Sequence, residues 1–280
     1  LCIVARFTAD YSETDLWWQF NHVPVDGAPM QEALSELKKQ WGAAGSVIYP
    51  AMNGPITVPE VMYCGDRIFR ARFYVDFSPV MKIRKHLNTN YRNKMNGNAS
   101  LASLLMWGLS RHSFFRRRKM LLPVDWYDLN QERELGLLII RPGVYDHDGE
   151  TPLQAFFRFQ REMNRRLAGI RHGNSESLEF LALCTMLHPM VYLLVKKIAP
   201  TALSEIVGTM GISIIRDAEI FVSPLTDLQS NGFMSLGSTS IRTADGRTAG
   251  SVCICGSRAQ IRCYYEAISS LYEELGQLMK

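Results

Sequence analysis

The chain has 280 residues, 47% of them hydrophobic, and carries a formal net charge of +4. This length and composition allow a sizeable core in one or two domains. The small charge argues against a nucleic-acid-binding protein, which would need a concentrated basic face. The six cysteines form no CxxC pair, and this favours reduced thiols in a cytoplasmic protein over a metal site or disulfides. The longest apolar stretch, 178–195, is interrupted by His188-Pro189 and is therefore expected not to span a membrane.

The first part of the chain alternates between strand and helix patterns. An aromatic-rich run predicts a buried strand, and apolar residues at helical spacing predict an amphipathic helix after it. A Gly- and Pro-rich stretch without periodicity predicts a linker. The expected elements are a strand at 14–20, a helix at 28–41, an irregular segment at 43–59, a strand at 67–78, a helix at 79–92 that begins at Pro79, and a helix at 100–111.

The second part continues the alternation. The expected elements are strands at 119–129 and 134–143, a helix at 151–171, strands at 207–215 and 232–242, a turn at 244–247, a strand at 248–256 and a helix at 263–280. Mixed strand and helix patterns of this kind predict an α/β protein, arranged as an α+β two-layer sandwich in which helices cover a mixed sheet.

The motif HVPVDG, residues 22–27, stands between the predicted strand 14–20 and the helix 28–41. A neutral imidazole such as that of His22 can accept a proton near pH 7. Asp26 and Gly27 form a dipeptide that is common in turns, and Gly27 supplies backbone freedom there. A histidine that only bonds its own backbone at a strand end, beside an ordinary turn aspartate, is the alternative interpretation.

Two segments share one plan of strand, short link and amphipathic helix: 14–41 and 250–278. In the second segment Ser257 stands at the position that His22 takes in the first. We interpret the pair as a duplicated unit whose chemistry is kept in one copy.

These residues resemble a known family. HVPVDG resembles the HxxxDG motif of the chloramphenicol acetyltransferase-like superfamily, and it is particularly similar to the motif in the catalytic domains of dihydrolipoyl acyltransferases. ELGLLIIRPG (134–143), GTMGISII (208–215) and GFMSLGSTS (232–240) resemble strands of the same family. The resemblance implies that 1–42 is the last strand and helix of a first acyltransferase unit, 43–53 a linker, and 54–280 a second unit with a degenerate motif. It also implies that about one hundred residues or more precede this sequence in the whole protein.

The resemblance implies an enzyme that transfers an acyl group from a thioester to a hydroxyl, amine or thiol acceptor. His22 would be the general base, Asp26 would hold its loop through an arginine (Arg6, Arg258 or Arg262), and Ser213 would donate to the oxyanion. The substrate-binding residues expected beside these three are Gly27, Thr209 and Ser235, with Thr209 also an alternative to Ser213. Acyl-coenzyme A, acyl-phosphopantetheine or a lipoyl group would be the co-substrate, with no tightly bound cofactor and no metal. The expected partners are the small-molecule donor and acceptor, a carrier protein, and either a second copy of the chain or the missing N-terminal half.

Alternatives remain open. A non-catalytic scaffold or binding unit of the same fold fits the degenerate second motif. A condensation-domain relative fits as well, although such domains normally have histidine where this chain has Asn21. The basic run 111–119 could bind phosphates or form a solvated loop, and the apolar segment 172–200 could line a tunnel for an acyl chain or pack in the core.

Overall fold

A computed structural model describes a large part of the chain. The described residues are 2–7, 14–19, 36, 52, 54–65, 68–127, 133–171, 194, 197, 198, 210–214, 232–237, 241–243 and 245–280. The chain divides into two compact units, Leu1–Ile48 and Tyr49–Lys280. The boundary between these units falls inside the segment 43–53 that the sequence predicts as a linker.

The first unit contains two described strands. β1 (Cys2–Phe7) pairs with β2 (Thr14–Gln19) in an antiparallel ladder in which Cys2 lies opposite Gln19. β2 confirms the strand predicted at 14–20, whereas β1 was not predicted. The predicted helix 28–41 lies outside the described residues except for Glu36, which is helical.

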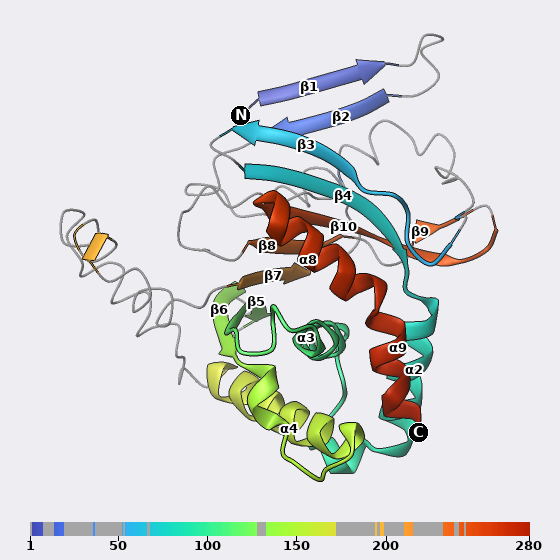
Figure 1. Cartoon of the computed structure of the whole chain (residues 1–280), viewed down its shortest axis with the longest axis vertical. Helices are drawn as coiled ribbons and strands as arrows, with labels where there is room; N and C mark the ends of the chain where they lie inside the picture. Colours follow the sequence, from blue (N-terminus) through green and yellow to red (C-terminus); the bar gives the residue numbers. More distant parts are fainter. Residues whose placement is uncertain are drawn as a thin grey trace. The chain divides into compact units, whose positions relative to one another are not determined.

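The second unit is built on an eight-stranded mixed sheet (Figure 1). Its strands are β3 (Glu60–Gly65), β4 (Ile68–Asp76), β5 (Met120–Tyr127), β6 (Arg133–Ile140), β7 (Met210–Ile214), β8 (Phe233–Leu236), β9 (Ile241–Arg242) and β10 (Thr248–Gly256). They lie in the order β3-β4-β10-β8-β7-β5-β6, and β9 pairs with β10. β7 runs parallel to both β5 and β8, and the other pairs are antiparallel.

Helices lie together on one side of this sheet in Figure 1. They are α2 (Ser78–Asn90), α3 (Leu101–Arg111), α4 (Pro152–Arg171), α8 (Arg258–Ser269) and α9 (Leu271–Gly276), with short 3₁₀ segments at Arg92–Met95, Pro142–Tyr145 (η2) and Gln277–Met279. Buried aromatic and aliphatic side chains join them to the sheet in one core, in which Trp107 packs edge-on against Phe156 with ring centroids 5.6 Å apart. The predicted class, an α/β fold with helices covering a mixed sheet, is confirmed.

Local sequence signals set the helix ends. Ser100 and Ser103 form a reciprocal capping box that starts α3 one residue after the predicted start. Pro79 lies in the first turn of α2, where its missing N–H costs no hydrogen bond. Asn88 exchanges side-chain hydrogen bonds with the backbone of Ala99, which joins the end of α2 to the start of α3.

Two predicted elements are wrong in extent. The strand predicted at 232–242 is two strands, β8 and β9, which pair with different parts of β10. The helix predicted at 263–280 begins at Arg258, because Ser257 and Gln260 form a capping box there, and it is broken at Ser270 into α8 and α9. Both errors arise because hydrophobic periodicity does not mark a change of pairing partner or a helix cap.

Strand periodicity assigns each residue of the central strands to one face of the sheet. Phe73 of β4, Val252 of β10, Leu236 of β8 and Ile212 of β7 belong to the core that the helices cover. The residues between them in sequence therefore point to the opposite face. Among the described residues, no helix is long and apolar enough to cross a lipid bilayer.

Candidate functional site

Ser213 and Ser235 lie side by side on the sheet face opposite the helices. They are register partners on the parallel strands β7 and β8, and register partners project from the same face. The sequence predicted both as site residues, from two separate segments. The structure brings these two together.

The same row continues across the sheet. Cys253 of β10 lies opposite Ser235, and Arg72 of β4 lies opposite Cys253. Arg72 Nη2 donates to the hydroxyl of Tyr74 at 2.7 Å. The face opposite the helices thus carries hydroxyl, thiol and guanidinium groups, whereas the helix face is apolar.

Two hydroxyls on this face lack hydrogen-bond partners in the described part of the protein. They are Oγ of Ser235 and Oγ of Ser251, and both side chains are almost fully buried. Nε of Arg70, on the same face, is also buried without a partner. Buried polar groups are nearly always hydrogen-bonded, so a polar ligand on this face would meet donors that are unpaired within the described residues.

The two serines of this row are neutral hydrogen-bond donors, and Arg72 adds a cationic one. A serine hydroxyl can donate to a carbonyl oxygen or to the oxyanion that forms from it, and donors fixed before the reaction need no reorganisation. Ser213 is half-buried, so it is the more accessible of the pair. Among the described residues, no group of three or more His, Cys, Asp or Glu side chains is arranged to hold a metal ion.

Four of the predicted site residues lie outside the described residues: His22, Asp26, Gly27 and Thr209. Their roles stay predictions, as does the arrangement of His22 relative to Ser213. The segment 172–200 also lies outside the described residues except at Leu194, Lys197 and Ile198, which are helical and exposed.

Ser257, which stands at the position of His22 in the second sequence copy, is the N-cap of α8 and exchanges capping hydrogen bonds with Gln260. Two of the arginines named as candidate partners of Asp26, Arg258 and Arg262, have other contacts here. Arg262 pairs with Glu266 at 2.7 Å, and the guanidinium carbon of Arg258 lies 4.8 Å from the ring centroid of Phe69.

The basic run 111–119 is a turn anchored by its own aromatic residues. Phe115 is buried against Tyr264, with ring centroids 4.7 Å apart. Arg118 stacks over Phe114 at 4.3 Å and donates to its carbonyl oxygen at 2.8 Å. Arg111 pairs with Asp146 at 2.6 Å. Parts of the run therefore have structural roles, and phosphate binding by its exposed arginines stays a prediction.

No protein-family model matches the sequence, and no curated protein sequence matches it. Several solved structures align with the chain at low sequence identity. A "probable dihydrolipoamide acetyltransferase" from Listeria monocytogenes 4b F2365 aligns over 91% of this chain and 95% of its own, with 9% identity and a TM-score of 0.45. A chloramphenicol acetyltransferase aligns over 77% of this chain and 100% of its own, with 10% identity and a TM-score of 0.44.

A wax ester synthase/diacylglycerol acyltransferase from Marinobacter aquaeolei VT8 aligns over 90% of this chain but 57% of its own, with 11% identity and a TM-score of 0.41. These proteins are acyltransferases by name. The chemistry of the candidate site rests on the residues of this chain.

Sequence reasoning missed Ser251, Arg70 and Cys253 as members of the polar face. The signal that could have found them is strand alternation: in β4 and β10 every second residue joins the core, and the residues between are polar or small. On this polar face the residues of β4 are half-buried, and Ser251 and Cys253 of β10 are buried.

Proposed function

We propose that this chain carries part of an acyltransferase that moves an acyl group from a thioester donor to a hydroxyl, amine or thiol acceptor. The single observation that supports this most is the HVPVDG motif at residues 22–27, and the Ser213–Ser235 pair on β7 and β8 adds the donors such a reaction needs. Acyl-coenzyme A, or an acyl group on phosphopantetheine or lipoyl carried by a protein, would be the donor.

In the proposed reaction, the neutral imidazole of His22 takes the proton of the acceptor as its heteroatom attacks the thioester carbonyl carbon. The carbonyl oxygen becomes an oxyanion and accepts a hydrogen bond from the Ser213 hydroxyl. Collapse of the tetrahedral intermediate breaks the carbon–sulfur bond, and the leaving thiolate recovers the proton from the imidazolium. Asp26 and Gly27 would hold the loop of His22, and Thr209 and Ser235 would contact the donor.

The test is thioester consumption by the full-length chain, followed by chromatography of the released coenzyme A, with acetyl- and lauroyl-coenzyme A as donors. Replacing a general base lowers the rate by about 10²–10⁴-fold, so His22→Ala should do so. His86→Ala is the matched control, because His86 lies on α2 beside Asn90, outside the proposed machinery.

Unchanged consumption by His22→Ala would refute the role of the histidine. If the wild-type chain consumes neither thioester nor an acyl-phosphopantetheine carrier, the non-catalytic scaffold becomes the better interpretation. Release of free acid rather than acylated acceptor would point to hydrolysis instead of transfer.

A further inference from the structure

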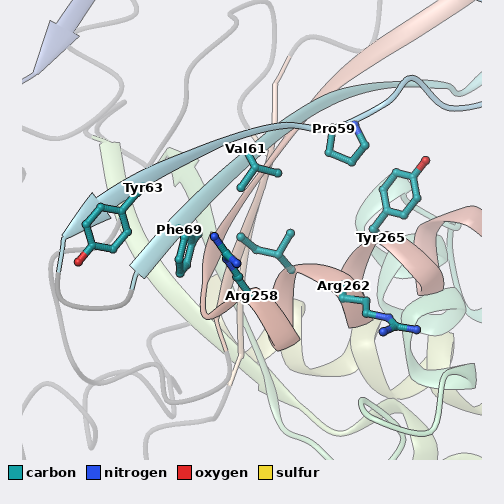
Figure 2. Close-up of a pocket in the computed structure, with 8 residues that line it drawn as sticks. Pro59, Val61, Tyr63, Phe69, Arg258, Arg262 and Tyr265 are labelled. Atoms are coloured by element: carbon teal, nitrogen blue, oxygen red, sulfur yellow. The ribbon is translucent and has the colours of Figure 1, made fainter.

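A groove with a volume of about 520 Å³ lies between the edge strand β3 and helix α8 (Figure 2). This volume is within the range of small-molecule sites. Its lining includes Val61, Tyr63 and Phe69 from the sheet. The helix contributes Arg258, Arg262 and Tyr265. All of them belong to the second unit.

The groove and the serine row lie on opposite faces of the same sheet. Val61 is the register partner of Ala71, and Tyr63 that of Phe69. Ala71 belongs to the core covered by the helices, so these side chains share the helix face. The groove is therefore separate from the Ser213–Ser235 pair, and the inference below does not depend on the proposed function.

The sheet wall of the groove is apolar and exposed. The side chains of Val61 and Tyr63 are 53% and 63% exposed, although both face the helix layer. The ring of Tyr63 lies 5.2 Å from that of Phe69 in a tilted pair. On the helix side, Tyr265 is held edge-on against Phe73 at 5.5 Å. Aromatic walls held by such contacts offer a preformed surface for a flat or aliphatic body.

The charge of the groove is positive. Arg258 projects from the first turn of α8 toward Phe69, and its guanidinium carbon lies 4.8 Å from the ring centroid. Arg258 makes no ion pair within the described part of the chain. Arg262 is partly neutralised by Glu266, which it contacts through Nε at 2.7 Å. Among the described residues that line the groove, none carries a carboxylate.

We propose that this groove binds an amphipathic anion, in which a carboxylate, sulfonate or phosphate is attached to an aromatic or aliphatic body. The anionic group pairs with the guanidinium of Arg258, which can offer two parallel N–H donors. The apolar body lies against Val61, Tyr63 and Phe69 and removes their exposed surface from water. The positive end of the α8 dipole adds to the attraction.

The probe is 8-anilinonaphthalene-1-sulfonate, an aromatic sulfonate whose fluorescence rises on desolvation, titrated into the full-length chain. N-phenyl-1-naphthylamine, which has the same rings without the sulfonate, is the matched ligand. Arg258→Glu should weaken sulfonate binding at least about tenfold, as expected for loss of a charge-assisted pair, and leave the uncharged ligand nearly unaffected. A glutamate in the first helical turn interacts favourably with the positive end of the helix dipole, so the substitution should not unfold α8.

Lys82→Glu is the control for net charge, because Lys82 is an exposed residue of α2 outside the groove. Tyr63→Ala should weaken both ligands, since it removes a wall and not the charge. The proposal is overturned if the wild-type chain shows no saturable sulfonate binding, if Lys82→Glu weakens it as much as Arg258→Glu, or if both ligands bind wild type equally.

Discussion

Ser213 and Ser235 are register partners on the adjacent parallel strands β7 and β8, yet they differ in environment. Ser213 is half-buried, whereas Ser235 is 1% exposed and its hydroxyl has no hydrogen-bond partner among the described residues. A buried hydroxyl without a partner costs stability. Mutation of Ser235 therefore tests an effect on stability, and mutation of Ser213 tests an effect on catalysis.

Ser235→Ala should stabilise the protein. The substitution removes a buried hydroxyl that gains no hydrogen bond in the fold, so the free energy of unfolding should rise by about 0.5–1 kcal/mol. Urea unfolding of the second unit, followed by circular dichroism, measures this change. A clear loss of stability would show that the hydroxyl has a partner in the folded protein.

Ser103→Ala is the matched control for that measurement. Ser103 is as buried as Ser235, but its hydroxyl accepts from Ser100 N at 3.0 Å and donates to Ser100 O at 2.8 Å. Removal of this capping group should lower the free energy of unfolding by about 1 kcal/mol. If Ser235→Ala raises the free energy of unfolding and Ser103→Ala lowers it, the two environments described above are supported.

Ser213→Ala tests the proposed oxyanion donor. Loss of one such donor should lower kcat for thioester consumption by about 10²–10³-fold with little change in KM. Ser213→Thr keeps the hydroxyl and should retain far more of the activity. If KM rises while kcat is unchanged, Ser213 contributes to binding and does not stabilise the transition state.

Much of the secondary structure was predictable because it depends on local signals. β2, β4, β5, β6, β10, α2, α3 and α4 lie within a few residues of their predicted positions. β1 and β3 were not predicted. β3, with the sequence EVMYCG, is short and lacks clean alternation, and its pairing with β4 depends on a partner that periodicity does not reveal.

The site was predictable only in part, for a related reason. Ser213 and Ser235 were selected from separate segments by family resemblance, but their pairing depends on the strand order β10-β8-β7, which no local pattern contains. To predict the groove from the sequence, one would have to know that β3 lies at the sheet edge and that α8 begins at Arg258. Periodicity alone places the start of that helix at 263, five residues after Arg258.

Glu162 of α4 should make stability depend on pH. Hydrogen bonds from Arg165 and Arg166 lower the pKa of its carboxyl from 4.5 to about 2. A pKa lowered by folding gives stability that is present above about pH 4.5 and is lost as the pH falls toward 2. Arg166 also donates to Ile139 O at 2.8 Å, so this carboxylate supports the contact of α4 with β6.

Glu162→Gln should therefore lower the free energy of unfolding by up to about 1 kcal/mol at pH 7, since a partly exposed pair is screened by solvent. The difference from wild type should shrink steadily between pH 5 and pH 3 in urea titrations. Glu273→Gln, at an exposed carboxylate of α9, is the control for charge. A difference that is constant across this range would contradict the linkage.

Gly143 should be intolerant of a side chain because the basic run 111–119 passes against it. A Cβ at Gly143 in η2 would lie 2.0 Å from the carbonyl oxygen of Arg116, a backbone atom that cannot rotate away. Gly143→Ala should therefore lower the free energy of unfolding by about 1–3 kcal/mol, as overpacking does.

Gly276→Ala is the control, because no atom lies within 4 Å of the added Cβ. It should instead raise the free energy of unfolding by a few tenths of a kcal/mol to about 1, because alanine favours the helix end. Thermal unfolding of both variants measures the contrast. If Gly143→Ala is as stable as wild type, the run does not lie against η2.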